Sequence, residues 1–146
     1  MTVGHEQLSA LWLATLQRIT DRIAHDLRNT LNGVAVNVEV VRSRAARGGD
    51  AATIAPFASV AASQVEILSS RTDALIGLVR PAQPPVDIGG LVARLVMLLR
   101  ASDGKGDIDL DVPMEAGGAS SAASGDATRL AVGAALLAAL ERGGRI

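Results

Sequence analysis

The feature of this 146-residue chain that most constrains its fold is a stretch, residues 6–47, with no proline and one glycine, Gly33. Apolar residues recur there at steps of three or four, the spacing that lines one face of an α-helix. This stripe consists of Trp12, Leu16, Ile19, Ile23, Leu27, Leu31, Val34, Val38 and Val41. A helix of this length approaches about 60 Å, which is long for a globular domain and ordinary for a helix bundle.

A second amphipathic helix is predicted for residues 51–80, after a break at Gly48-Gly49-Asp50. Asp50 is suited to cap this helix, and Pro56 lies close enough to its start to occupy the first turn, where a missing N–H costs little. Two long amphipathic helices joined by a short loop form an antiparallel hairpin. One hairpin cannot cover its own apolar stripe, so we expect a homodimer in which two hairpins form a four-helix bundle.

A stiff Pro-rich linker, residues 81–85, separates the hairpin, residues 1–80, from a C-terminal part, residues 86–146. The sequence predicts a small α+β unit there. Its expected elements are a helix over residues 88–100 capped by Asp87, a strand over 108–112, a low-complexity segment over 115–125, and a last helix capped by Asp126 that ends near Arg142. The fold class is therefore mainly α with a small α+β C-terminal part.

The composition argues against several classes of function. With 14 Lys and Arg against 15 Asp and Glu, the chain lacks the overall basic charge that favours nucleic acid. It contains no cysteine, which excludes disulfides, thiolate metal sites and cysteine nucleophiles. The longest apolar run, residues 130–140, is about half of the roughly 20 residues that cross a bilayer. We therefore expect no membrane segment and a cytoplasmic location.

The candidate functional residues lie on the first helix, around His25. On a helical projection centred on Ile23 of the stripe, His25 and Asn29 fall on the opposite, solvent-facing side. Asp26 follows His25, and no second His or Cys lies nearby, which disfavours a metal site. A solvent-facing imidazole beside a carboxylate is suited to nucleophilic chemistry, because the carboxylate can bind one ring nitrogen and leave the other basic.

The stretch His25-Asp26-Leu27-Arg28-Asn29-Thr30-Leu31-Asn32 resembles the H box of two-component sensor histidine kinases, usually written H-[ED]-[LI]-[RK]-[NTS]-P-L. In that family the motif lies on the first helix of a hairpin that dimerises into a four-helix bundle. The resemblance implies that His25 accepts a phosphoryl group and that Asp26 is its acid/base partner. It also implies that Asn29 matches the position that orients water in phosphatase reactions. Thr30 replaces the usual proline, which implies a softer helix kink.

Residues around the motif are candidates for partner binding, namely Arg22, Arg28 and Asn32. Residues 18–47 contain six Arg and three acidic residues, a local charge of +3. This charge suits the acidic face of a receiver domain and would steer the encounter. An ordinary solvated helix face is the alternative interpretation.

Histidine kinases carry an ATP-binding domain after the hairpin, and Asp126-Ala127-Thr128-Arg129-Leu130 resembles the start of its N box. The two Asn positions of that box hold Leu136 and Leu140 here, and leucine offers no oxygen ligand to Mg²⁺. The glycine-rich boxes that follow the N box in that family are missing from the sequence. We therefore expect a degenerate, truncated domain without ATP binding or autokinase activity.

This combination is similar to kinase-like histidine phosphotransferases, which are dimers that relay a phosphoryl group between receiver aspartates. The expected function is such a relay through His25, with Mg²⁺ held by the partner receiver and no cofactor on this chain. Two alternatives stay open. The hairpin is a non-catalytic module that docks a histidine kinase or response regulator, or it is a phosphatase that uses Asn29 to align water against a phosphoaspartate.

Overall fold

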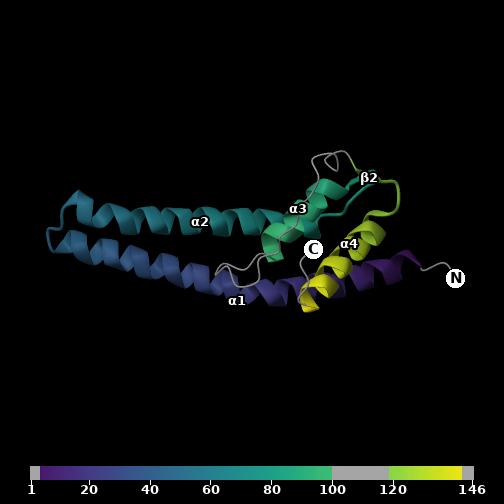
Figure 1. The fold of residues 1–146 in the computed structure, drawn as a ribbon, viewed down its shortest axis with the longest axis horizontal. Helices are drawn as coiled ribbons and strands as arrows, with labels where there is room; N and C mark the ends of the chain where they lie inside the picture. Colours follow the sequence, from purple (N-terminus) through teal and green to yellow (C-terminus); the bar gives the residue numbers. More distant parts are fainter. Residues whose placement is uncertain (1–3, 100–118, 143–146) are drawn as a thin grey trace. The chain divides into compact units, whose positions relative to one another are not determined.

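The computed structural model describes residues 4–99 and 119–142 of the chain (Figure 1). Its elements are α1 (His5–Ala46), α2 (Ala51–Val79), β1 (Val86–Asp87), α3 (Ile88–Leu99), β2 (Ser120–Ser121) and α4 (Gly125–Glu141). The short strands β1 and β2 pair antiparallel, with Val86 opposite Ser121. The prediction of a mainly helical chain with a small α+β part is confirmed. The predicted strand over residues 108–112 lies outside the described residues.

The loop between α1 and α2 has the geometry that its two glycines allow. Gly48 adopts a left-handed conformation with φ of 74°, which glycine accepts without steric cost. The N–H of Gly48 bonds to the carbonyl of Ala45 over 3.1 Å, and the N–H of Gly49 bonds to that of Arg44 over 2.9 Å. This pair of bonds is the Schellman motif, which satisfies the last carbonyls of α1 and ends the helix.

Two predicted helix caps are confirmed. A carboxylate oxygen of Asp50 accepts a hydrogen bond from the N–H of Thr53 over 2.8 Å at the start of α2. A carboxylate oxygen of Asp87 accepts one from the N–H of Gly90 over 3.0 Å at the start of α3. Each carboxylate satisfies an N–H that would otherwise lack a partner in the first turn of its helix.

Two other details of the helix starts were predicted wrongly. Pro56 is the sixth residue of α2 and lies beyond its first turn, so α2 gives up one internal hydrogen bond there. Asp126 does not cap α4, because the hydroxyl of Ser124 accepts the hydrogen bond from the N–H of Ala127 over 3.3 Å. Asp126 lies inside the first turn instead, where its negative charge interacts favourably with the helix dipole.

The chain divides into two compact units. Unit 1 comprises Met1–Ile23 and Ala74–Ile146, and unit 2 comprises Ala24–Asp73. Unit 1 holds most of the buried apolar side chains, and they come from both sides of the Pro-rich segment 81–85. These are Trp12, Leu16, Ile19, Ile23, Ala74, Leu78, Val86, Leu91, Leu95, Leu98, Leu99, Leu136 and Leu137.

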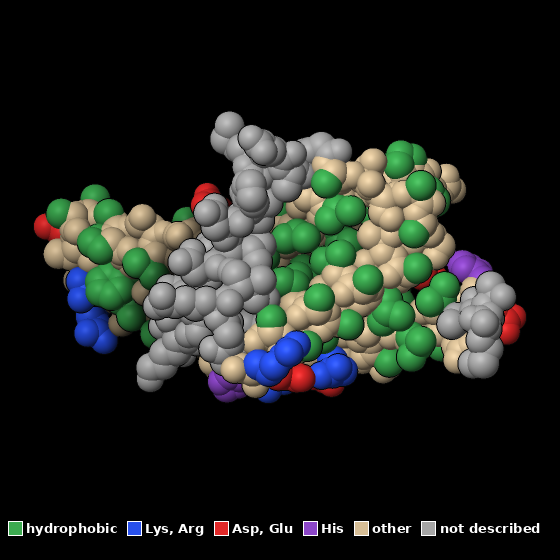
Figure 2. All heavy atoms as spheres, turned by 45° about the vertical axis from the view of Figure 1, so that its right-hand side comes forward, with side chains coloured by type: hydrophobic (Ala, Val, Ile, Leu, Met, Phe, Trp, Pro, Cys, Tyr) green, Lys and Arg blue, Asp and Glu red, His purple; other side chains and the backbone are tan. Residues whose placement is uncertain are grey.

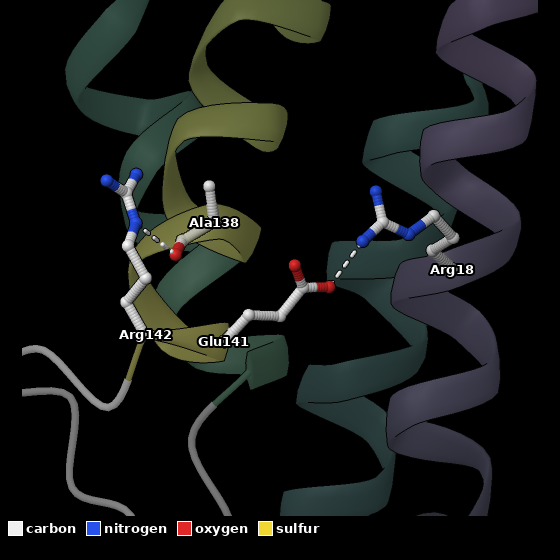
Figure 3. Close-up of polar contacts among 4 residues, drawn as sticks. All are labelled: Arg18, Ala138, Glu141 and Arg142. Carbon is white, nitrogen blue, oxygen red and sulfur yellow. Dashed lines mark hydrogen bonds and ion pairs between the residues drawn. The ribbon is translucent and has the colours of Figure 1, made fainter.

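Within unit 1, α4 lies against the N-terminal half of α1. A Cβ at Gly133 would lie 3.2 Å from the Trp12 ring and 3.3 Å from Thr15, so the missing side chain allows the two helices to approach closely. Near the end of α4, Glu141 forms an exposed ion pair with Arg18 (Figure 3). An exposed ion pair adds little stability, so the apolar contacts hold α4 in place.

Unit 2 leaves much of its apolar surface uncovered. The α1 stripe is buried at Ile19 and Ile23 in unit 1, whereas Leu31 is 57% exposed and Val38 is 51% exposed in unit 2. On α2, Val60 and Val65 are each 48% exposed. Figure 2 shows hydrophobic side chains on the surface at the hairpin end as well as around α3 and α4. A single hairpin therefore does not bury its own stripe, as predicted.

One described helix, α2, is long and apolar enough to cross a membrane by length and composition alone. The expectation of no membrane segment rested on the run 130–140 and did not include this helix. Its first half contains no charged residue, and its second half carries Glu66, Arg71 and Asp73. Charges of this kind are costly in the centre of a bilayer.

We expect Ile19→Ala to lower the free energy of unfolding by about 2–5 kcal/mol, because it opens a cavity in the core of unit 1. Ile19 is fully buried. Leu13→Ala, on the same helix but 56% exposed, is the matched control and should cost far less. Urea unfolding followed by circular dichroism measures both, and equal losses would contradict the described core.

A second prediction concerns pH. Hydrogen bonds from Thr53, first from its backbone N–H and then from its side chain, hold the pKa of the Asp50 carboxyl below its ordinary value. A carboxyl with a lowered folded-state pKa stabilises the fold above its unfolded pKa, and this contribution disappears as the pH falls through the folded value. Asp50→Asn keeps a capping oxygen at every pH, so we expect it to lose less stability than the wild type on acidification.

Urea midpoints measured from neutral pH into the acidic range test this expectation. Asp21→Asn is the control, because Asp21 is exposed and forms no hydrogen bond with any residue that the structure describes. The control should keep the wild-type pH dependence. Parallel curves for Asp50→Asn and the wild type would contradict the assigned cap.

Candidate functional site

The predicted site lies near the middle of α1, on the face opposite its buried stripe. Ile23 is 1% exposed and Thr30 is 8% exposed, and both face inward. His25 and Asn29, the two residues predicted to face outward, are both exposed, and so are the three candidates for partner binding, Arg22, Arg28 and Asn32. The helical phase predicted for the motif is therefore confirmed, and the His25 imidazole is accessible to another molecule.

Thr30 shows how the helix passes through the motif without a proline. Its hydroxyl donates to the carbonyl of Asp26, one turn earlier, over 2.9 Å. This local bond satisfies the polar end of a side chain that is otherwise buried. The helix α1 continues without interruption from His5 to Ala46, and the motif therefore lies on regular helix.

His25 and Asp26 are neighbours in sequence but do not bond to each other. Consecutive helical residues point about 100° apart around the axis. His25 is exposed and Asp26 is half-buried. In the part of the chain that the structure describes, neither side chain forms a hydrogen bond or an ion pair. The imidazole can therefore still rotate toward Asp26 or toward a partner.

The positive charge of residues 18–47 is not centred on His25. Arg22 and Arg28 flank the motif, and Asp21 and Asp26 balance them in the same stretch of helix. The excess lies toward the loop of the hairpin, because residues 39–47 contain three Arg and one acidic residue, Glu39. Electrostatic attraction at the motif itself must therefore come from individual arginines, and a broad basic field is lacking there.

The arginines of this helix differ in how they are engaged. Arg42 forms an ion pair of 2.7 Å with Glu39, and Arg44 lies 4.5 Å from the centre of the Phe57 ring. Arg22 and Arg28 are exposed and form no ion pair with the residues that the structure describes. These two guanidinium groups are thus available to acidic groups on a binding partner.

Arg71 on α2 is a residue that sequence reasoning missed. Its side chain is 5% exposed. The contacts Asn37–Gln64 and Arg44–Thr53 set the antiparallel register of unit 2, and this register places Arg71 across from Thr30. In the sequence, Arg71 falls in the gap between Leu68 and Leu75 of the apolar face of α2. A charged residue at a core-facing position was the available signal.

The residues that resemble the start of the N box are used for packing in unit 1. Asp126 accepts a hydrogen bond from the Ser9 hydroxyl over 2.5 Å. Arg129 is 6% exposed and donates to the carbonyl of Arg80. Leu136, at an Asn position of the family box, is 5% exposed in the core. Leu136 therefore offers no oxygen ligand at a position where the family box has an asparagine.

The arrangement offers one exposed imidazole on a regular helix, with amide and guanidinium groups beside it. Among residues 4–99 and 119–142, no three His, Asp or Glu side chains lie close enough together to hold a metal ion. No protein-family model, curated protein or solved structure matches the chain. The chemistry available at His25 is that of a nucleophile or a base open to solvent.

Proposed function

We propose that this chain is a histidine phosphotransfer protein that relays a phosphoryl group between receiver aspartates through His25. The observation that carries the proposal is the exposed His25 on an unbroken helix of a long hairpin, within a sequence that resembles the H box. In the transfer, an unprotonated ring nitrogen attacks the phosphorus of a phosphoaspartate. The bond from phosphorus to the carboxylate oxygen breaks, and the aspartate leaves as a carboxylate.

The proposed reaction needs little from this chain beyond an accessible imidazole. Mg²⁺ held by the receiver stabilises the charge on the transferring group, as it does in other phosphoryl transfers. Asp26 acts as acid/base partner when the imidazole turns toward it. Arg22, Arg28 and Asn32 contact the receiver surface, and they lie on the exposed side of α1 with His25. Asn29 lies about one helical turn from His25 and is also exposed, so its amide can orient a water molecule near the imidazole.

The phosphoryl donor in this proposal is another protein and not ATP. The Asn position that Leu136 occupies is apolar and buried in unit 1. A buried leucine cannot replace an amide oxygen as a ligand of Mg²⁺. The C-terminal part of unit 1 then contributes packing and a docking surface, and the chain has no autokinase activity. A cytoplasmic location, where receiver domains act, belongs to the same proposal.

The proposal includes a homodimer in which two hairpins form a four-helix bundle. Leu31, Val38, Val60 and Val65 expose about half of their side-chain surface or more in unit 2. A second copy of the hairpin would cover this surface and remove it from water. His25 lies on the other side of α1, so it would stay accessible in such a bundle.

Phosphotransfer profiling tests the relay. Purified chain and its His25→Ala variant are mixed with radiolabelled phospho-receiver domains from the same organism, and acid-labile label on the chain is followed over time. We expect rapid labelling of the wild type from one or two receivers and no labelling of the variant. Because His25 is exposed, the variant should unfold at the same temperature as the wild type, which excludes misfolding as the cause.

Other outcomes favour the alternatives. If no receiver labels the chain but one binds both the wild type and His25→Ala, the hairpin is a docking module and the relay is wrong. If a receiver loses phosphate faster in the presence of the chain and Asn29→Ala abolishes this effect while His25→Ala does not, the chain is a phosphatase.

The dimer has its own test, a mass from light scattering. We expect twice the 14.9 kDa of a single chain for the wild type. Val38→Asp places a charge on the exposed part of the stripe and should give a monomer. Val36→Asp is the matched control, because Val36 is 63% exposed but lies on the His25 side of α1 and should leave the dimer intact. A wild-type mass of one chain would overturn the bundle.

A further inference from the structure

A cavity of about 310 Å³ lies within unit 1, partly open to solvent, and the proposed function makes no use of it. It is lined by the first turns of α1, the end of α2 and the start of α4, including His5, Ser9, Trp12, Val79, Asp126 and Arg129. Its volume is at the lower end of the range for small-molecule sites. Its wall combines an indole ring, a buried guanidinium and an exposed imidazole.

Arg129 is the central polar group of this cavity. Arg129 is 6% exposed, and its guanidinium carbon lies 5.8 Å from the centre of the Trp12 ring. One nitrogen of the guanidinium donates to the carbonyl of Arg80. A guanidinium carries five N–H donors, and the other described residues accept none of the remaining ones. Because Arg129 lines the cavity, these donors can reach a ligand there.

The nearest carboxylate does not neutralise this charge by direct contact. Asp126 lies one helical turn from Arg129, but its carboxylate accepts the 2.5 Å hydrogen bond from Ser9. The two residues form no ion pair in the described part of the chain. Burial lowers the pKa of Arg129; the charge of Asp126 opposes this effect and the charge of Arg94 adds to it. No carboxylate of the described residues contacts the guanidinium directly, so its charge favours an anion in the cavity.

We propose that this cavity binds a small organic carboxylate, whose oxygens accept hydrogen bonds from Arg129 and His5. The apolar body of the ligand lies against Trp12 and Val79. Asp126 lines the same cavity, so a singly charged carboxylate fits better than a doubly charged phosphate. This site is separate from the His25 chemistry and does not depend on it.

Trp12 is the single tryptophan of the chain, so intrinsic fluorescence reports directly on this cavity. The full chain is titrated with benzoate, with the neutral isostere benzamide, and with inorganic phosphate. We expect a saturable change in Trp12 emission with benzoate, and at least tenfold weaker binding of benzamide, because benzamide cannot form the charge-assisted hydrogen bond. Phosphate should also bind more weakly than benzoate.

Variants locate the binding. Arg129→Gln and His5→Gln should each weaken benzoate binding severalfold or more, whereas Arg18→Gln, on an exposed arginine outside the cavity, should bind as the wild type does. If Arg129→Gln does not fold, His5→Gln and the comparison of benzoate with benzamide decide whether the cavity binds a carboxylate. Equal responses to benzoate and benzamide, tighter binding of phosphate, or no saturable change would each overturn the carboxylate site.

Discussion

An α-helix advances by 100° per residue, so burial of two side chains fixes the direction of every other residue on the same helix. Ile19 and Ile23 are almost fully buried in unit 1, and this burial sets the phase of α1. His25 then necessarily faces solvent, two residues after Ile23. The chemistry proposed for the chain thus depends on apolar packing against a helix face that bears no functional group.

The helices were predictable from the apolar periodicity and from the turn residues. The structure differs from the prediction where two or more local conformations are similarly favourable. The bounds of α1 and α2 were predictable because Gly48 and Asp50 leave the chain few other conformations. The cap of α4 was not predictable, because Ser124 and Asp126 are both good capping residues and tertiary contacts decide between them. Asp126 is bonded to Ser9, from the opposite end of the sequence, and no local pattern contains that information.

The candidate site was predictable in part for a related reason. The exposure of His25 and Asn29 followed from one helical projection. The position of Arg71 needed the register between two helices, which Gln64 sets through its contact with Asn37. The charge around His25 also needed more than a sum over residues 18–47, because Arg18 is paired with Glu141 and the unbalanced arginines lie near the loop. A sum of charges does not contain their positions, and the positions determine the local electrostatic field.

The close approach of α4 to α1 has a consequence for sequence variation. At Gly133 a methyl group would already lie 3.2 Å from the Trp12 ring, so the two positions share one volume. A larger residue at 133 is compatible with this packing only if a smaller one stands at 12. In any set of proteins with the same fold, the two positions should therefore vary together, large against small. Such a correlation between the first and the last helix would arise from the shared volume alone, independently of the polar contacts Ser9–Asp126 and Arg18–Glu141.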